Sequence, residues 1–279
     1  MKLKRKIKIG IDSPSAAGAG TISKMLAKNY NLLYCDTGKI YRYMAKQIIE
    51  KKPLNKIKFL KKISKKINLK KLNNKNLLTD DVAYTASQIA KDLRVRKLVV
   101  KFQKDLAYRP PKKFNGSILD GRDINSKIVK DADFKFYVTA SVTERAKRRF
   151  KELKKLGKKV TYSKILKNLK RRDLEDRSRR YSKLKKTKDS TLINTTNLSI
   201  KGSFLKVKKI IDKKLNIEME TETIEKKDVQ EFKALLEESF KKNSIKESTI
   251  IKAKVSEIGK KFDICEIPGS KFEGSIATE

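Results

Sequence analysis

The chain has 279 residues and a mass of 32.1 kDa, and its composition of 38% hydrophobic and 37% charged residues allows one good-sized buried core with a small appendage. It contains no histidine, which excludes Ser-His-Asp triads, histidine-ligated zinc and imidazole acid–base chemistry, and its two cysteines are too few for a disulfide framework. The formal net charge of +40 attracts polyanions, from nucleotide phosphates to nucleic acid.

A βαβ unit opens the chain. Residues 7–12 (IKIGID) predict a short buried strand, which a turn of small residues, SPSAAGAGT (13–21), connects to a helix with apolar side chains at helical spacing. LLYCD (32–36) predicts a second strand. A strand, a glycine-rich turn, a helix and a strand within about 30 residues are typical of a parallel sheet in an α/β protein.

Helical patterns fill residues 39–110, including a lysine-rich stretch at 51–75 that we expect to be solvated. The pattern predicts further strands at 117–123, 134–140 and 191–196. It also predicts two very basic helices at 143–157 and 163–180, which would form a hairpin, and a closing helix at 200–216.

The composition changes near the end of the chain. The net charge is +43 over residues 1–216 and −3 over the remainder, and residues 217–227 predict a linker. Residues 228–242 predict an amphipathic helix, and short alternating strands follow it. We therefore expect a body at 1–216 and a short α+β appendage at 228–279.

The turn at 13–21 has features of a phosphate-binding loop. Gly18 and Gly20 allow close approach of backbone N–H groups to phosphate oxygens at a helix N-terminus, and the Thr21 hydroxyl would reach a phosphate. The pattern G-x-x-x-x-G-K-[ST] is broken twice, because Ser13 replaces its first glycine and Ala19 its lysine. Taken alone, the turn fits a helix entry without a ligand equally well.

Further motifs follow this turn in a fixed order: YCDTGKIYRYMA, TASQIAKDLRVRK, LDGRDINSKIVKDADFKFYVTASVTERAKRR and RRDLEDRSRR. Together they resemble the bacterial cytidylate (CMP/dCMP) kinases over residues 7–216. The resemblance implies a P-loop nucleoside-monophosphate-kinase fold, with a parallel sheet covered by helices on both faces, an NMP-binding insertion at about 42–115 and a lid at about 150–180. It implies transfer of the γ-phosphoryl group of ATP to CMP or dCMP with Mg²⁺ in the cytoplasm.

The resemblance also assigns residues to roles. The ATP-binding residues would be Ser13, Pro14, Ser15, Ala16, Ala17, Gly18, Ala19, Gly20 and Thr21. The CMP-binding residues would be Thr37, Gly38, Tyr41, Arg42, Ser87, Arg96, Asp123 and Asp176. The catalytic residues would be Arg122, Arg149, Arg172 and Arg179. No metal ligand is assigned.

These roles have a chemical rationale, but each residue could also have a purely structural role. A hydroxyl, a guanidinium and a carboxylate (Ser87, Arg96, Asp123) would satisfy the donor and acceptor edge of cytosine and leave a wrong base unpaired. Asp123 would otherwise cap a helix and Ser87 would be a packing residue. Arg149 and Arg172 would otherwise be solvated. Tyr41 would otherwise belong to the core.

Arginine is scarce and clustered, which makes it informative. Nine of the 14 arginines lie between Arg122 and Arg180, as expected where planar, bidentate donors grip phosphate or carboxylate. For RAKRR (145–149), drift among arginine codons is the alternative. The other 58 basic residues are lysines, which favours coding bias over a dedicated nucleic-acid surface and leaves nucleic-acid binding open.

Three departures from the family pattern bear on the rate. Ala19 removes the charge that bridges the β- and γ-phosphates, which lid arginines or Lys24 would have to replace. Asn125 and Ser126 replace a Gly-Thr pair, and Asn194 replaces a strand-ending Asp. The alternatives to a (d)CMP kinase are therefore an impaired nucleotide-binding relic, an RNA-associated basic protein, or a kinase with another base preference.

The remaining expectations concern partners. We expect a monomer that binds ATP and CMP or dCMP and no membrane, because no run approaches the roughly 18 consecutive apolar residues of a spanning helix. The basic start of the chain lacks the apolar length of a secretory signal. The last 50 or so residues resemble the opening of the small-subunit ribosomal RNA-binding protein S-one, which is built of OB-folds with five strands each. The visible strands make up only part of one such fold.

Overall fold

The computed structural model describes residues 5–155, 157–215, 254–257, 262–266 and 273–277. The chain divides into two compact units, Met1–Leu215 and Asn216–Glu279, and each is described by itself. Among the described helices, none combines the length and the apolar character needed to span a lipid bilayer.

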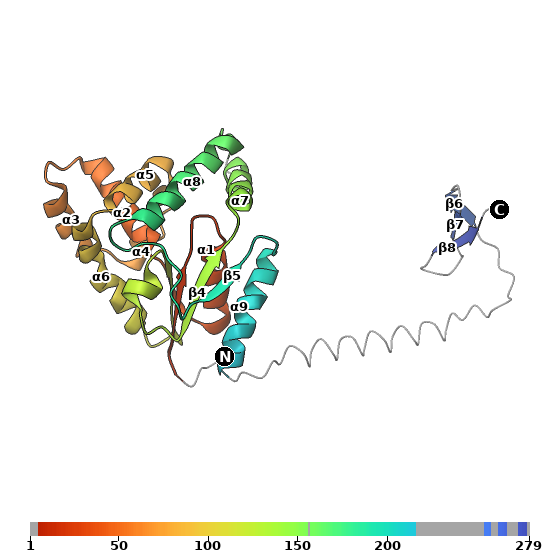
Figure 1. Cartoon of the computed structure of the whole chain (residues 1–279), viewed down its shortest axis with the longest axis horizontal. Coiled ribbons are helices and arrows are strands. Elements are labelled where there is room, and N and C mark those ends of the chain that lie inside the picture. The colour runs from red at the N-terminus through yellow and green to blue at the C-terminus, as the bar shows by residue number, and fades with distance from the viewer. Residues whose placement is uncertain (1–4, 156, 216–253, 258–261, 267–272, 278–279) are drawn as a thin grey trace. The chain divides into compact units, whose positions relative to one another are not determined.

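A five-stranded parallel sheet, in the order β2-β3-β1-β4-β5, forms the centre of the first unit (Figure 1). Its strands are β1 (Ile7–Asp12), β2 (Leu33–Asp36), β3 (Gly116–Gly121), β4 (Phe134–Thr139) and β5 (Thr191–Asn194). Each strand runs parallel to its neighbours, so all carboxyl ends meet at one edge of the sheet. At that edge Asp36 of β2 lies opposite Asp120 of β3.

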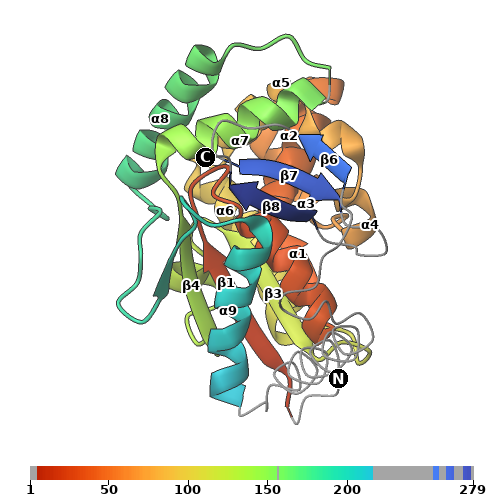
Figure 2. The ribbon, with the colours of Figure 1, turned by 90° about the vertical axis from the view of Figure 1, so that its right-hand side faces the viewer.

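Helices cover both faces of the sheet, as the βαβ pattern predicts. Helices α1 (Ala19–Tyr30) and α9 (Ile200–Leu215) pack together on one face (Figure 2). Helix α6 (Leu93–Tyr108) contacts β3 from the other side (Figure 1). The consecutive β1 residues Ile9, Gly10 and Ile11, which alternate between the two faces of the sheet, are all buried, as expected for a strand covered on both faces.

A helical insertion separates β2 from β3. Its elements are α2 (Gly38–Lys51), α3 (Lys56–Ser64), α4 (Leu69–Leu72), the 3-10 helix η1 (Lys75–Leu78), α5 (Asp80–Ile89) and α6. Leu60 and Leu72 belong to a stretch predicted to be solvated, yet both are buried in the insertion's hydrophobic core. The prediction was therefore wrong for the apolar side of this stretch, because its leucines and isoleucines other than the exposed Leu54 pack in or against this core.

A hairpin of two basic helices follows β4. Helices α7 (Val142–Lys155) and α8 (Tyr162–Ser178) pack through a small core of their own, formed by Ala146, Leu153, Ile165 and Leu169. Figure 1 shows the hairpin beyond the carboxyl ends of the strands. The apolar contact between these two helices, whose sequences are dominated by lysine and arginine, is therefore narrow.

Strand β3 ends two residues earlier than predicted, at Gly121. The buried carboxylate of Asp12 accepts hydrogen bonds from the backbone N–H groups of Ile124 (2.7 Å) and Asn125 (3.0 Å). These bonds draw the chain out of the sheet into a π-helical turn, Ile124–Ile128. Arg122 and Asp123 consequently belong to a loop at the sheet edge and not to the strand. The predicted strands at 134–140 and 191–196 are also shorter, ending at Thr139 and Asn194.

The second unit contains three described strands. Strands β6 (Lys254–Glu257), β7 (Phe262–Glu266) and β8 (Glu273–Ala277) form an antiparallel sheet in that order. The predicted linker at 217–227 and helix at 228–242 lie outside the described residues. The resemblance of this segment to an OB-fold protein stays a prediction.

Candidate active site

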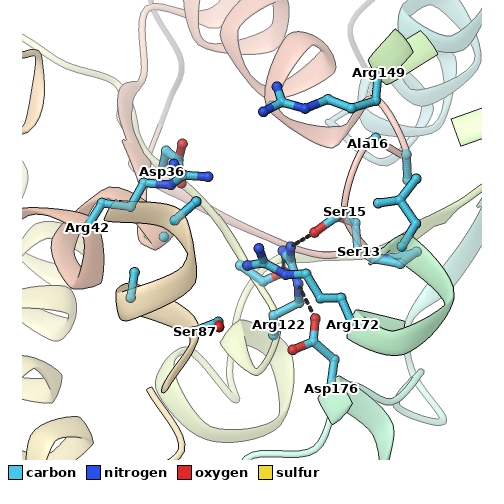
Figure 3. Close-up of a pocket in the computed structure, with 18 of the residues that line it drawn as sticks. Ser13, Ser15, Ala16, Asp36, Arg42, Ser87, Arg122, Arg149, Arg172 and Asp176 are labelled. Atoms are coloured by element: carbon cyan, nitrogen blue, oxygen red, sulfur yellow. Dashed lines mark hydrogen bonds and ion pairs between the residues drawn. The ribbon is translucent and has the colours of Figure 1, made fainter. Parts of the chain in front are cut away.

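A cavity of about 820 Å³ lies at the carboxyl ends of the parallel strands (Figure 3). Its wall is formed by the turn at 13–21, by α2 and α5 of the insertion, by the loop after β3 and by the α7–α8 hairpin. Open α/β sheets bind ligands at this edge. Every residue that the sequence analysis assigned to ATP binding, CMP binding or catalysis lines this cavity. The structure thus brings the whole set together, while the individual roles stay predictions.

The turn between β1 and α1 is shaped to receive an anion. Gly18 adopts a left-handed conformation (φ +90°), and its carbonyl accepts hydrogen bonds from the N–H groups of Thr21 and Ile22, both at 3.1 Å. The N–H groups at the start of α1 have no partner within the helix, and the helix dipole favours negative charge there. Ala16 is also left-handed (φ +62°), a conformation that costs a residue with a Cβ atom.

Ala19 begins α1 and is 5% exposed, so the wall of the cavity has a methyl group where the usual phosphate loop has a lysine. Lys24 lies on the same helix and lines the same cavity. Within the described part of the chain, Lys24 forms no ion pair. Its side chain is exposed.

An ion pair links the insertion to the loop after β3. Arg96 of α6 donates a hydrogen bond to Asp123 over 2.8 Å, and both side chains are at most a tenth exposed. The guanidinium of Arg96 also lies over the ring of the buried Tyr41, 5.5 Å from its centre. Asp123 precedes a helical turn but makes no capping hydrogen bond with its side chain, so the capping alternative was wrong. Tyr41 both packs in the core and lines the cavity.

The other residues predicted to bind the acceptor lie around this pair. Thr37, at the start of α2, donates from its hydroxyl to the carbonyl of Asp120 at 2.8 Å. The Ser87 hydroxyl donates to the carbonyl of Tyr84 at 2.7 Å on α5. Arg42 donates from Nη1 to the carbonyl of Leu77 at 3.1 Å, which holds its guanidinium against the 3-10 helix η1.

Asp176 of α8 lies between two of the predicted catalytic arginines. Arg122 donates from Nε to one of its carboxylate oxygens at 3.0 Å, and Arg179 contacts the other. Arg122 also donates to the Ser15 hydroxyl at 2.9 Å, so it bridges the phosphate turn and the hairpin (Figure 3). Burial lowers the pKa of both arginines, and the charges of Arg96 and Arg122 lower that of Arg179 further, to about 10.

Arg172 brings a buried nitrogen without a hydrogen-bond partner to the cavity. Its Nε atom is buried and has no hydrogen-bond partner. Burial lowers the pKa of Arg172 to about 9, and the neighbouring charges of Arg122 and Arg42 contribute to the same shift. Arg149, also predicted to face the reaction, lines the cavity but pairs with Glu152 at 2.8 Å on the hairpin surface.

Two carboxylates that the sequence analysis did not single out face the phosphate turn. Asp36, the last residue of β2, lies opposite Asp120, the next-to-last residue of β3, and Tyr34 donates from its hydroxyl to Asp120 at 2.8 Å. Burial raises the pKa of Asp120 from 3.8 to about 7, and the charge of Asp36 adds to this shift. The sequence carried only part of this signal, since Asp36 ends a predicted strand and Asp120 lies inside another, and only the structure shows that the two strands are neighbours. No group of three or more acidic, histidine or cysteine side chains suited to a metal occurs among the described residues.

Two arginines of RAKRR are integral to the structure. Arg145 is 3% exposed and donates to the carbonyl of Ser15 and to Asp173 of α8. Arg148 donates to the hydroxyl and carbonyl oxygens of Thr195, whose hydroxyl in turn donates to the carbonyl of Ala17. Drift among arginine codons is therefore the wrong explanation for these two positions.

The substituted family positions are accommodated locally. The buried side chain of Asn125 donates to the carbonyl of Phe136 at 3.1 Å, and its Oδ1 atom lies 2.1 Å from where a Cβ atom on Gly10 would be. The missing side chain of Gly10 thus provides the space that Asn125 occupies. Asn194 accepts hydrogen bonds from the backbone and hydroxyl of Thr196 and shapes the loop after β5.

A comparison with protein families identifies the family of this chain. The model of the cytidylate kinase family matches residues 9–213, which is most of the chain. The chain belongs to the cytidylate kinase family. As a member, it is an ATP-dependent nucleoside-monophosphate kinase.

Three relatives show the extent of the similarity. The chain is 39% identical over 206 residues to the cytidylate kinase of Bartonella bacilliformis, which covers 73% of this chain and 94% of that protein. It is 37% identical over 209 residues to the cytidylate kinase of Sinorhizobium medicae (75% and 97%). It is 35% identical over 230 residues to the cytidylate kinase of Caldicellulosiruptor saccharolyticus (77% and 100%). The family match ends at residue 213, before the second unit.

Proposed function

We propose that this chain transfers the γ-phosphoryl group of ATP to CMP or dCMP, with ADP and CDP or dCDP as products. The observation that carries the proposal is Arg172, whose buried Nε atom has no hydrogen-bond partner and whose charge is opposed by neighbouring arginines. An anion at this point would supply both the missing acceptor and the missing negative charge. A phosphoryl group in transfer is such an anion, because charge spreads over its oxygens.

The acceptor nucleotide would lie between the insertion and the loop after β3. The ion pair of Arg96 and Asp123, with Ser87 nearby on the same wall, presents donors and acceptors in a buried setting. A cytosine pairs with such a set, whereas uracil, with the opposite polarity at its ring N3 and exocyclic position, leaves buried groups unpaired. This chemistry supports a preference for cytosine.

The reaction itself requires little covalent chemistry from the protein. An oxygen of the acceptor phosphate attacks the γ-phosphorus of ATP, and the bond from that phosphorus to the bridging oxygen of ADP breaks. The acceptor oxygen is already ionised, so no general base is needed, in keeping with a chain without histidine. The side chains of Arg122, Arg172 and Arg179 would align the two phosphates and neutralise charge in a pocket shielded from water.

Mg²⁺ fits the pair of carboxylates at the edge of the sheet. Asp36 and Asp120 offer hard oxygen ligands next to the phosphate turn, and Mg²⁺ is commonly held by one or two carboxylates together with substrate phosphates. Burial and the charge of Asp36 raise the pKa of Asp120 even though the charge of Arg122 acts in the opposite direction, so a bound cation would favour the ionised carboxylate. When bound, Mg²⁺ would screen the phosphates from each other and from these acids.

The missing lysine at position 19 calls for other cations. Arg172 and Arg149 line the cavity from the α7–α8 hairpin, and Arg172 has unused hydrogen-bonding capacity. We infer that these lid arginines replace the lysine and that the enzyme is active. A nucleotide-binding relic is the second candidate, and the specific observation in its favour is Ala19.

Thermal unfolding of the full chain in the presence of CMP, UMP or AMP tests the proposal without relying on turnover. We expect CMP to raise the melting temperature more than UMP or AMP does at equal concentration, because a ligand that binds only the folded state stabilises it. No stabilisation by any of the three would contradict the proposal. Retention of RNA at moderate salt, together with no response to nucleotides, would favour the RNA-associated alternative.

A further inference from the structure

Arg145 is among the most completely buried charged side chains of the first unit, although it comes from a helix in which seven of the fourteen residues are lysine or arginine. Its Nε donates to the carbonyl of Ala140 at 3.0 Å, where β4 ends. One Nη donates to the Ser15 carbonyl and to Asp173, both at 3.1 Å, and the other Nη contacts the same carboxylate. The side chain therefore joins the sheet, the phosphate turn and α8.

A second arginine makes a parallel connection. Arg122 donates to the hydroxyl of Ser15 and to Asp176 of α8. The guanidinium group of each arginine thus binds both Ser15 and a carboxylate of α8. Asp173 and Asp176 are three residues apart on the helix and lie on the same side of it. Together the two arginines form a double bridge between the phosphate turn and the lid helix.

The two arms of this bridge differ in accessibility. The side chain of Arg145 is 3% exposed and that of Asp173 is 13% exposed, whereas the Arg122 side chain is 23% exposed and lines the cavity. Arg145 does not line the cavity. A phosphate that enters the cavity competes for Arg122 but has no access to Arg145.

We propose that Arg145 is a positioning residue for phosphoryl transfer. Through its bonds to Asp173 and Ser15, it fixes the distance between α8 and the phosphate turn. The guanidinium of Arg172, which precedes Asp173 in α8, is thereby placed at the reacting phosphate. The Arg145 arm stays closed through the cycle, while the Arg122 arm exchanges Asp176 for the acceptor phosphate. This inference rests on the proposed kinase function, because it assigns a role within that reaction.

Kinetics of the full chain separate this role from a general effect on stability. Arg145→Met should lower kcat by about 10²-fold, since a displacement of about 1 Å at a reacting group costs that much, and should change the KM for CMP far less. Arg145→Lys should restore part of kcat, because an ammonium group keeps one bond to Asp173 but loses the fork. Lys147→Met is the matched control on the exposed side of α7 and should behave as the wild type.

A double-mutant cycle tests the partner. If Arg145 acts through Asp173, the double variant Arg145→Met with Asp173→Asn should lose no more kcat than the worse single variant. Multiplying losses would overturn the inference, as would a kcat for Arg145→Met equal to that of Lys147→Met. Should Arg145→Met fail to fold, Asp173→Asn alone must lower kcat with little change in KM, and an unchanged kcat then overturns the inference.

Hydrogen exchange of the ligand-free protein provides a readout that does not depend on turnover. Arg145→Met should speed amide exchange in α8 while leaving β1 protected. If the wild type has no kinase activity, the proposed function fails whatever the exchange shows. If the wild type is active and α8 exchange is unchanged in Arg145→Met, the positioning role fails alone.

Discussion

Arg96 and Asp123 form a buried ion pair at 2.8 Å between the helical insertion and the loop that follows β3. Removing one partner leaves a buried charge without compensation. We predict that Asp123→Ala lowers the free energy of unfolding by about 3–5 kcal/mol. Asp123→Asn should cost less, because an amide oxygen still accepts from Arg96. Urea unfolding measures both, and equal stability of Asp123→Ala and wild type would show that the pair is not buried in solution.

The same pair should govern acceptor choice. We predict that Asp123→Asn lowers the ratio of kcat/KM for CMP over UMP by at least tenfold, because the site loses one fixed hydrogen-bonding group. Initial rates with the two acceptors at several concentrations give this ratio. A ratio unchanged from the wild type would exclude Asp123 from base recognition.

Arg172 is predicted to support activity without contributing to the stability of the ligand-free protein. Arg172→Met should lower kcat by about 10²–10³-fold, the usual effect of losing one electrostatic donor. It should leave the melting temperature of the ligand-free protein unchanged or higher, because a buried cation without a partner is removed. Lys170→Met, an exposed neighbour on α8, is the control and should alter neither. A loss of stability that parallels the loss of activity would contradict this account of Arg172.

The acidic pair at the sheet edge predicts a pH dependence. Burial and the charge of Asp36 raise the pKa of Asp120 from 3.8 to about 7, so the folded protein holds a proton that the unfolded chain has released. The resulting stability is fully present below pH 3.8 and is lost as the pH rises to about 7. We predict that Asp120→Asn is more stable than the wild type at pH 8, with a smaller difference at pH 5. Urea midpoints at both values check this, and equal differences would contradict the raised pKa.

Position 19 offers a gain-of-function test. If the turn holds the phosphates of ATP, Ala19→Lys should raise kcat, by up to about 10²-fold if the lid arginines replace the lysine poorly. Ala27→Lys, two turns further along α1, introduces the same charge away from the turn and should have no such effect. An unchanged rate in Ala19→Lys would mean that the arginines have fully replaced the lysine.

Local patterns were enough to predict the parallel sheet. The glycine-rich turn between two short apolar runs specifies a βαβ unit, and the helical periodicity of the insertion and hairpin is strong. The strand after the insertion was predicted too long because its end is set by Asp12, more than a hundred residues earlier, whose carboxylate draws the loop out of the sheet. No local pattern carries that information.

The site residues that belong to sequence motifs could be predicted. Those whose role depends on a contact with a residue far away in the sequence were missed. The residues assigned by resemblance all line one cavity. Arg145 was missed because RAKRR reads as one more basic run, and its partner Asp173 lies 28 residues away on another helix. Asp36 and Asp120 were missed because Asp36 ends one predicted strand while Asp120 lies inside another, and their pairing follows from a strand order that the sequence does not state.

The most direct measurement is CMP-dependent release of ADP from ATP by the full-length chain with Mg²⁺. The account predicts turnover above background with CMP or dCMP, a lower kcat/KM with UMP and AMP, and loss of turnover in Arg172→Met but not in Lys170→Met. No release above background with any acceptor, in a protein that is folded, would contradict it and leave the cavity as the remnant of a nucleotide site.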